Sequence, residues 1–407
     1  MDRDAGPGAA TWRRRGVMQF EHAHGFRPQV RDLLVAEWPE AWQHWLDLGA
    51  EAIELPLPGV GTPPVGVRSR RATYERALRR AAAGVDGLTV EVGRVSGLVE
   101  RGGRVVGVVA DGAAIEADLV IDAGGRLSRL TAPPDLSGDT GIAYVNRNYR
   151  RHDGVEPGPM NGPVAWFGAF DGYAVYVFPH ERGHFSAVIV RPTADADLTV
   201  LRHVEAFDSA CEAIPGLADW THPQLATPTS GVLLGVRLLN VYRPQLCRPG
   251  LVALGDAVST TAPTAGRGVA MASMQIGGLL DLLDGGADPV TIAAPFGPWC
   301  DQWIRPWVQD HLAVDAEAVR RWQGADMDLT QPLTSAAIVA AAERDPRIGH
   351  HLAGHLAMTA LPSSLAPAEP LARAVYETDW RPPLSQGPTR QQLIDTAVTA
   401  VTARRVA

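Results

Sequence analysis

The chain has 407 residues, 46% of them hydrophobic and 20% charged, so it is long enough for two or three packed units with a large core. Its formal net charge of -8 argues against general nucleic-acid binding, which requires a basic face that neutralises phosphates. All 37 basic residues are arginine, so no lysine-dependent catalysis is available.

The N-terminal part is predicted to combine two helices with a meander of strands. Residues 1–27 are charged and loop-like, whereas the apolar spacing after Pro28 predicts an amphipathic helix, and residues 71–83 predict a second. Alternating apolar residues and glycine turns predict a three-stranded meander over 88–116, with strands at 88–92, 95–100 and 105–110. Residues 118–121 are apolar after Asp118, as expected for a buried parallel strand.

The middle of the chain is predicted to form an antiparallel sheet. Its strands are expected at 142–149, 164–170, 173–178 and 185–190, with Asp171-Gly172 as a tight hairpin turn. A helix near 203–214 and a strand near 231–242 follow, and the chain after residue 296 reads as helical.

The most informative stretch is Leu251 to Ala270, which reads LVALGDAVSTTAPTAGRGVA. An apolar strand ends at Gly255-Asp256, a loop with Pro263 follows, and Gly266-x-Gly268 opens a long apolar helix. This order places a carboxylate at the end of a buried strand, beside the exposed N–H groups of a helix N-terminus. Such a corner can bind a hydroxyl of a polyol and stabilise a developing anion.

This stretch closely resembles the second flavin-binding motif of FAD-dependent monooxygenases of the para-hydroxybenzoate hydroxylase fold. The resemblance implies that Asp256 binds the ribityl chain of FAD and that the helix end faces the isoalloxazine. It assigns cofactor contacts to Gly255, Asp256, Pro263, Gly266 and Gly268.

Further segments resemble motifs of the same family. Asp122-Ala-Gly-Gly-Arg-Leu-Ser-Arg129 is similar to its middle motif, which lies near the pyrophosphate and implies cofactor roles for Asp122, Gly125 and Arg126. Arg13-Arg-Arg-Gly-Val-Met-Gln19, followed by His22-x-His24, is similar to an R-R-G-V-P-Q…H-x-H stretch, which implies roles for Arg15 and Gln19. Met18 stands where the family usually has proline.

Two weaker resemblances concern Arg71 and Asp2. Arg71-Ala-Thr-Tyr-Glu75 is similar to the family's R-x-x-(L/F)-E helix start, where the arginine points toward the cofactor. Met1-Asp-Arg-Asp4 resembles the end of the family's second strand, which implies that Asp2 binds the adenosine ribose. The family's preceding βαβ unit with G-x-G-x-x-G is not in this sequence, and we expect a start codon assigned too late rather than a true truncation.

Each of these motifs also has an ordinary structural interpretation. An arginine cluster is commonly a solvated face, and the Asp122 segment alone could be a strand-end turn. The H-x-H pair could suggest a metal, but no third ligand stands at suitable spacing, so no metal is expected. Tyr144, Arg147 and Tyr149 are predicted to share one face of a strand, and are candidates for substrate binding or for an ordinary outward face.

The implied fold is α/β, with a FAD-binding Rossmann-like domain that lacks its first βαβ unit, an inserted antiparallel substrate domain and a helical C-terminal segment. The expected boundaries are 1–135 and 243–295 for the two parts of the FAD-binding domain, 136–242 for the substrate domain and 296–407 for the helical region.

The expected location is the cytoplasm. Cys211, Cys247 and Cys300 match no zinc or redox spacing, and neither a membrane-spanning run nor a signal peptide is visible.

The resemblance implies an FAD-dependent monooxygenase that hydroxylates or epoxidises an apolar or aromatic small molecule of specialised metabolism. Reduced flavin would react with O2 to form a C4a-hydroperoxide. Because the flavin would carry the chemistry, no catalytic side chain is expected. Electrons would come from NAD(P)H directly or through a separate flavin reductase. A halogenase is disfavoured because its lysine and W-x-W-x-I-P stretch are absent.

Two alternatives remain open. One is a non-redox cyclase or isomerase on the same scaffold with structural or no flavin, which Arg267 in place of a common glutamine mildly favours. The other is a non-catalytic binding protein that retains the substrate cavity.

Overall fold

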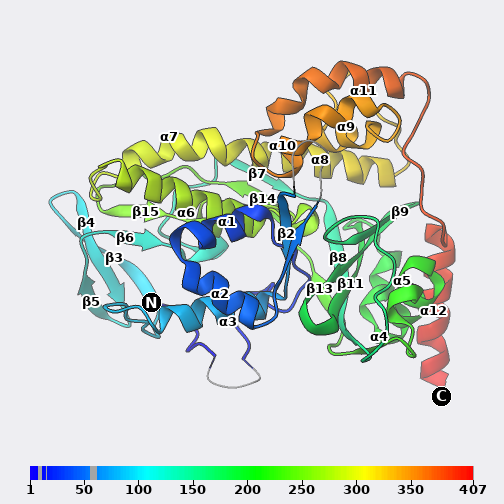
Figure 1. Cartoon of the computed structure of the whole chain (residues 1–407), viewed down its shortest axis with the longest axis horizontal. Helices are drawn as coiled ribbons and strands as arrows, with labels where there is room; N and C mark the ends of the chain where they lie inside the picture. The colour runs from blue at the N-terminus through cyan, green and yellow to red at the C-terminus, as the bar shows by residue number, and fades with distance from the viewer. Residues whose placement is uncertain (8–11, 15, 56–61, 407) are drawn as a thin grey trace.

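The computed structural model describes residues 1–7, 12–14, 16–55 and 62–406 and has a mixed α/β fold (Figure 1). Its buried apolar residues form several separate cores. Three helices and a hairpin form the N-terminal unit, around a core of Phe26, Trp45 and Val67. The indole N–H of Trp45 donates to the hydroxyl of Ser69 at 2.9 Å, so the polar atom of this large buried ring has a hydrogen-bond partner. The elements are α1 (Pro28–Glu37), α2 (Pro39–Asp47), β1 (Glu51–Glu54), β2 (Pro64–Arg68) and α3 (Arg71–Ala82).

A pair of parallel strands forms the base of the region that carries the flavin-like motifs. β6 (Val120–Asp122) pairs with β15 (Leu251–Ala253), and α6 (Gly268–Asp284) and α7 (Ala293–Trp303) pack beside them with a largely apolar interface. Among the described residues, β15 is the only strand partner of β6, and Ile121 on β6 is 50% exposed. Asp2 makes a separate parallel bridge to Val92, whose side chain is 57% exposed.

The meander is confirmed in its position but differs in its strands. It consists of β3 (Val95–Arg101), β4 (Arg104–Ala110) and β5 (Ala113–Glu116), in that order. The prediction of a meander strand at 88–92 is wrong, because this segment lies outside the sheet and only Val92 forms a bridge. Its valines and leucine suit a strand, but the two β-turns at 101–104 and 110–113 already close a three-stranded unit without it.

The predicted antiparallel sheet is present. Its strands run in the order β12-β8-β11-β10-β9, with β13 also paired to β8. Their bounds are β8 (Ile142–Arg151), β9 (Trp166–Phe170), β10 (Tyr173–Pro179), β11 (His184–Pro192), β12 (Ala226–Pro228) and β13 (Leu233–Gly235). A smaller sheet, β16-β14-β7, links this region to the corner where β15 ends at Gly255-Asp256 and α6 begins, which we call the flavin-like corner. Its strands are β7 (Leu136–Asp139), β14 (Leu239–Tyr242) and β16 (Ser259–Thr260).

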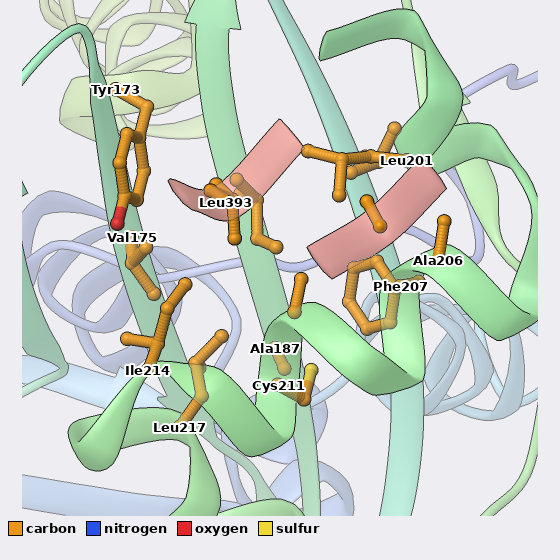
Figure 2. Packing of buried hydrophobic residues seen from close by; sticks show 14 of the residues in the cluster. Tyr173, Val175, Ala187, Leu201, Ala206, Phe207, Cys211, Ile214, Leu217 and Leu393 are labelled. Atoms are coloured by element: carbon orange, nitrogen blue, oxygen red, sulfur yellow. The ribbon is translucent and has the colours of Figure 1, made fainter. Parts of the chain in front are cut away.

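One face of the large sheet is covered by helices. Phe207 and Ile214 pack with sheet residues such as Val175 and Ala187 in a continuous apolar core (Figure 2). The covering helices are α4 (Val204–Ala213), α5 (Pro215–Thr221) and α12 (Arg390–Val406).

The chain after residue 296 is helical, as predicted, but does not form a single unit. α8 (Arg305–Trp322) lies against the flavin-like corner, while three further helices form their own core around Ile338, Leu365 and Tyr376. These are α9 (Ser335–Ala341), α10 (Leu352–Leu356) and α11 (Glu369–Tyr376). α12 then returns to α4, because Leu393 and Ala397 complete the core of the antiparallel sheet. No helix among the described residues is long and apolar enough to cross a membrane.

Candidate cofactor site

The Gly-Asp motif forms a sharp corner at the end of β15. Gly255 has φ +64°, a left-handed conformation that favours glycine, and its N–H donates to Gln275 of α6 at 2.8 Å. The following 3-10 turn, Gly255–Ala257, presents the half-buried carboxylate of Asp256. Within the described part of the chain this carboxylate accepts no hydrogen bond and forms no ion pair. Burial raises its pKa, although the nearby guanidinium groups of Arg71 and Arg126 act in the opposite direction.

The start of α6 lies beside this corner and has free backbone donors. A 3-10 turn at Pro263–Ala265 ends in Gly266, whose φ of +61° again suits glycine, and α6 begins at Gly268. No side chain among the described residues caps the helix N-terminus, so its first N–H groups and the positive end of the helix dipole are available to an anion.

The H-x-H segment lies against this loop. A Cβ on Gly266 would lie 3.5 Å from the carbonyl oxygen of Gly25, and Arg27 donates to the carbonyl oxygen of Ala265 through Nε at 3.1 Å and Nη2 at 2.7 Å. His24 is held by the carbonyl oxygen of His22, 2.9 Å from its Nδ1. Burial, and to a smaller extent the charge of Arg71, lowers the pKa of His24 to about 3.

The Asp122 loop also reaches this corner, but the aspartate itself points into its own turn. The Asp122 carboxylate accepts from the N–H of Gly124 at 2.9 Å and from the hydroxyl of Ser128 at 2.5 Å, so it orders the loop. Gly125 has φ +77° and open space where a Cβ would stand. Arg126 donates to the sulfur of Met18 at 2.7 Å, so this loop contacts the Arg13–Gln19 segment.

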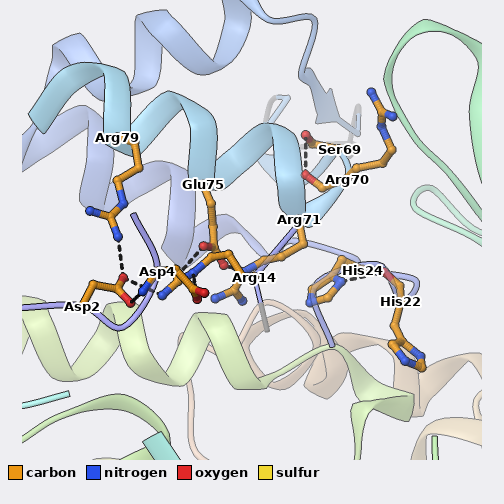
Figure 3. Close-up of polar contacts among 10 residues, drawn as sticks. All are labelled: Asp2, Asp4, Arg14, His22, His24, Ser69, Arg70, Arg71, Glu75 and Arg79. Atoms are coloured by element: carbon orange, nitrogen blue, oxygen red, sulfur yellow. Dashed lines mark hydrogen bonds and ion pairs between the residues drawn. The ribbon is translucent and has the colours of Figure 1, made fainter. Parts of the chain in front are cut away.

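A network of charged residues fixes the first residues of the chain to α3 (Figure 3). Arg14 donates to Asp2 at 2.6 Å, to Asp4 at 3.2 Å and to Glu75 at 2.5 Å, and Arg79 also pairs with Asp2. Burial alone would lower the pKa of Arg14, but the hydrogen bond and charge of Glu75, together with Asp2, raise it. The Asp2 carboxylate is therefore already engaged by two arginines.

Sequence reasoning missed Arg14, Glu75 and Arg79 in this network. The four-residue spacing of Arg71, Glu75 and Arg79 is a signal that could have identified one charged face of α3. Arg71 indeed donates to Glu75 at 2.6 Å. Arg15 lies outside the described residues. Gln19 is in a turn, where its carbonyl oxygen accepts from the N–H of His22 at 3.1 Å.

Tyr144, Arg147 and Tyr149 do not share a face of the strand, so the prediction of a common face is wrong. Side chains alternate along a strand, and Tyr144 differs from Arg147 and Tyr149 by an odd number of positions. Arg147 pairs with Asp208 of α4, and Tyr149 stacks on Phe185 in the core under the helices.

Tyr144 lies on the opposite face, in edge-to-face contact with His22 at 5.4 Å between ring centroids. That second face carries polar residues that sequence reasoning also missed. Asn146 is fully buried, and Asn148 donates to the carbonyl oxygen of Glu21 at 2.8 Å. A cavity of about 240 Å³ lies nearby, lined by Arg13, Arg14, Val17, Met18, Phe20, Glu21, His22 and Leu233. The Asn residues gave no signal because asparagine is typical of turns rather than strands.

The described residues contain no group of three or more His, Cys, Asp or Glu side chains placed to hold a metal ion. No family model matches the chain, and no curated protein matches its sequence.

Solved structures share its fold. The flavin-dependent brominase Bmp2 aligns with a TM-score of 0.61 and 15% identity, over 88% of this chain and 90% of that protein. PqsL, described as a probable FAD-dependent monooxygenase from Pseudomonas aeruginosa, aligns with a TM-score of 0.56 and 14% identity, over 79% and 90% of the two chains. CmlS, a flavin-dependent halogenase, aligns with a TM-score of 0.52 and 15% identity, over 95% and 72%. The protein therefore has the fold shared by FAD-dependent monooxygenases of the para-hydroxybenzoate hydroxylase type and flavin-dependent halogenases.

Proposed function

We propose that this protein is an FAD-dependent monooxygenase that acts on an apolar or aromatic small molecule, with O2 as the oxygen source and NAD(P)H as the reductant, used directly or through a flavin reductase. The observation that carries the proposal is the carboxylate of Asp256, which has no partner among the described residues, beside an N-terminus of α6 that no described side chain caps. A carboxylate accepts hydrogen bonds from the hydroxyls of a ribityl chain, and a helix N-terminus stabilises a negatively charged ring system.

The chemistry of the surrounding residues fits FAD. Arg71 and Arg126 both lie close enough to Asp256 to influence its pKa, and guanidinium groups bind phosphate well. Gly125, Gly255 and Gly266 have left-handed backbone and no side chain, which permits close approach of a ligand. We assign Asp256 to the ribityl chain, the α6 N-terminus with Gly266 and Gly268 to the isoalloxazine, and Arg126 and Arg71 to the phosphates.

Asp122, Pro263 and Asp2 have supporting roles in this proposal. Asp122 orders the loop that carries Gly125 and Arg126, and Pro263 sets the turn before Gly266. Asp2 remains the proposed contact to the adenosine ribose. Its carboxylate would exchange its ion pairs with Arg14 and Arg79 for hydrogen bonds to the ribose. Gln19 stays a proposed contact to the cofactor, because the neighbouring residue Met18 contacts Arg126.

When bound and reduced, FAD would supply the activation of O2, by which one oxygen atom would enter the substrate and the other would leave as water. The protein binds and orients the two reactants and excludes water from the site. Tyr144 is the proposed substrate contact of β8, since Arg147 and Tyr149 face the helix-covered core. The absence of lysine from the chain supports oxygenation over halogenation.

The test is the affinity for FAD, measured from its absorbance and fluorescence after addition to the purified protein. Asp256→Asn is expected to weaken FAD binding at least tenfold, because a neutral amide accepts the ribityl hydroxyls less strongly than a carboxylate. Asp281→Asn, on the exposed side of α6, is the matched control and should leave the affinity unchanged.

Activity provides the second readout. Consumption of O2 and NAD(P)H in equal amounts, coupled to oxygen insertion into a substrate, is expected. No FAD binding by the folded protein, or turnover of a substrate without O2 and reductant, would contradict the proposal and favour a non-redox enzyme.

A further inference from the structure

Helix α8 carries a stripe of buried residues that faces the flavin-like corner. Trp307, His311 and Asp315 recur every four residues on one side of the helix, and they are 0%, 1% and 2% exposed. The stripe continues at the same spacing to Val319, which packs with apolar residues such as Tyr144 on the face of the antiparallel sheet opposite the covering helices. One side of α8 therefore changes from polar to apolar along its length.

The polar part of this stripe meets Arg267, the residue that precedes α6. The Arg267 guanidinium lies 4.7 Å from the centre of the Trp307 indole ring and donates to Asp310 at 2.7 Å. Its Nη2 also contacts Nε2 of His355 on α10 at 3.4 Å. Arg267, Trp307, His311 and His355 form what we call the donor cluster, and every member is less than a tenth exposed.

Five nitrogen atoms of the donor cluster have no hydrogen-bond partner among the described residues. They are Nε of Arg267, Nε1 of Trp307, Nδ1 of His355 and both ring nitrogens of His311. Buried polar atoms without a partner are rare in folded proteins, because each loses its hydrogen bonds to water without replacement. A group of five in one place indicates that something else completes these bonds.

The missing partner must be an acceptor. The guanidinium of Arg267 can only donate, so the Nε2 of His355 that faces it must accept. Burial lowers the pKa of His355 to about 4, so its single proton stands on the unpartnered Nδ1. The pKa of His311 is also lowered, first by burial and then by Arg267 and Arg27, so it offers one donor and one acceptor. The cluster thus holds four unused N–H donors and one unused acceptor.

The charges nearby favour an anion. Arg267 is balanced by Asp310, but Arg27 donates only to the carbonyl oxygens of Ala265 and Leu356 and has no carboxylate partner in the described part of the chain. Burial, with repulsion from Arg267, lowers the pKa of Arg27 to about 10. An added negative charge would relieve this repulsion.

Asp315 does not fill that role. It lies one turn beyond His311, and Asn240 of β14 holds its carboxylate through a hydrogen bond of 2.7 Å. Burial raises the pKa of Asp315 to about 6, so it already has difficulty in keeping its own charge.

We propose that the donor cluster binds the carboxylate of the substrate, which is therefore a carboxylic acid with an apolar body. This inference rests on the proposed function, since it assigns the substrate class of the same site. The apolar body would lie along α8 toward Val319, Trp322 and Tyr144, which pack together with Tyr176 and Phe178. His311 and Val319 are eight positions apart, which corresponds to about 12 Å along the helix, enough for a single aromatic ring with a short acid chain.

The experiment compares 3-phenylpropionate with its neutral amide, 3-phenylpropionamide, as probes of the purified protein. Binding is measured by calorimetry, and its place by the indole N–H resonance of Trp307 in protein labelled with ¹⁵N-tryptophan, assigned through Trp307→Phe. We expect the acid to bind at least tenfold more tightly than the amide and to shift the Trp307 resonance. Equal affinities, or an acid that leaves Trp307 unshifted, would overturn the proposal and leave buried water as the partner of the donors.

Variants test the cluster directly. His311→Phe is expected to weaken binding of the acid at least tenfold and to change binding of the amide little. His350→Phe, at an exposed histidine, is the control and should change neither affinity. If His311→Phe fails to fold, the comparison of acid and amide on the unmodified protein still decides. FAD titration of the same samples separates the two proposals: acid binding without FAD binding contradicts only the flavin function, and FAD binding without acid selectivity contradicts only the donor cluster.

Discussion

Asp256 illustrates how a residue can be unfavourable for the fold and useful for a ligand. Its carboxylate has no partner among the described residues, and burial raises its pKa above the ordinary 3.8. A carboxylate in this state costs free energy of folding that a hydroxyl-rich ligand could return.

The flavin-free protein should therefore gain stability when this charge is removed. Because the pKa of Asp256 is raised in the folded state, its ionised form destabilises the fold at pH 7, and this effect disappears as the pH falls below 3.8. We expect Asp256→Asn to raise the Tm of the FAD-free protein at pH 7, although it weakens FAD binding. The measurement is thermal unfolding at pH 7, 5 and 4; a lower Tm at pH 7 would show that the carboxylate has a structural partner.

At the same scale, the structure brings the loops that carry the motifs close together, whereas the cofactor roles of their side chains stay predictions. Asp122 was expected to contact the cofactor, yet its carboxylate is used by Gly124 and Ser128 in its own turn. The side chain of an aspartate two residues before a glycine can accept a hydrogen bond from the backbone of its own turn or from a ligand. The sequence alone does not distinguish these two possibilities.

At the scale of elements, Glu181 joins α3 to the hairpin between β10 and β11. It is fully buried and accepts from the backbone N–H of Arg70 at 2.8 Å, from Nε of Arg70 at 2.7 Å and from the hydroxyl of Thr73. Burial would raise the pKa of Glu181, but Arg70 and Thr73 lower it. The negative charge of Glu181 thus lies at the N-terminus of α3, where it complements the helix dipole, and it links the antiparallel sheet to this helix.

Removal of this acid is expected to be costly. Glu181→Ala leaves the donors of Arg70 and Thr73 without an acceptor in a buried position, and we expect a loss of about 2–3 kcal/mol in the free energy of unfolding. Chemical denaturation of the variant measures this loss. The matched control is Glu100→Ala, which removes an exposed pair with Arg248 and should cost less than about 1 kcal/mol. Similar losses in both variants would refute a special role of Glu181.

The arrangement of elements also shows where local patterns stop being sufficient. The segment 88–92 has the composition of a strand, but in the described part of the chain its one β-bridge joins Val92 to Asp2, because strand formation depends on an available edge. The helix α12 follows all other elements in the chain yet completes the core under the antiparallel sheet, a contact between residues about two hundred positions apart that no local pattern encodes.

For the whole molecule, several buried histidines predict that acid weakens the fold. Burial lowers the pKa of His180 to about 4 and that of His355 to about 4, from an ordinary 6.5. Between pH 6.5 and about 4 the unfolded chain therefore binds protons that the folded protein excludes, so stability falls across this window by about 1.4 kcal/mol per pH unit for each proton. Asp315, with its pKa raised to about 6, acts in the opposite direction and offsets part of the loss.

His180→Gln tests this prediction. The free energy of unfolding, measured from pH 7 to pH 4.5, should depend on pH with a slope smaller by roughly one proton than that of the unmodified protein. His350→Gln removes an exposed histidine and should leave the slope unchanged. An unchanged slope in His180→Gln would mean that this histidine is protonated in the folded protein.

The sequence by itself determined the main helices, the long strands of the antiparallel sheet and the corner at Gly255-Asp256, because strand alternation, helical spacing and glycine turns act over a few neighbouring residues. It also determined which loops carry the flavin-like motifs. The tertiary structure alone decided which face Tyr144 occupies, that Asp122 orders its own loop, and that Arg14 bridges Asp2 and Glu75. It also brought His311, His355 and Arg267 together from α8, α10 and the start of α6. Burial and the charges of distant neighbours set these roles, and both exist only after the chain has folded.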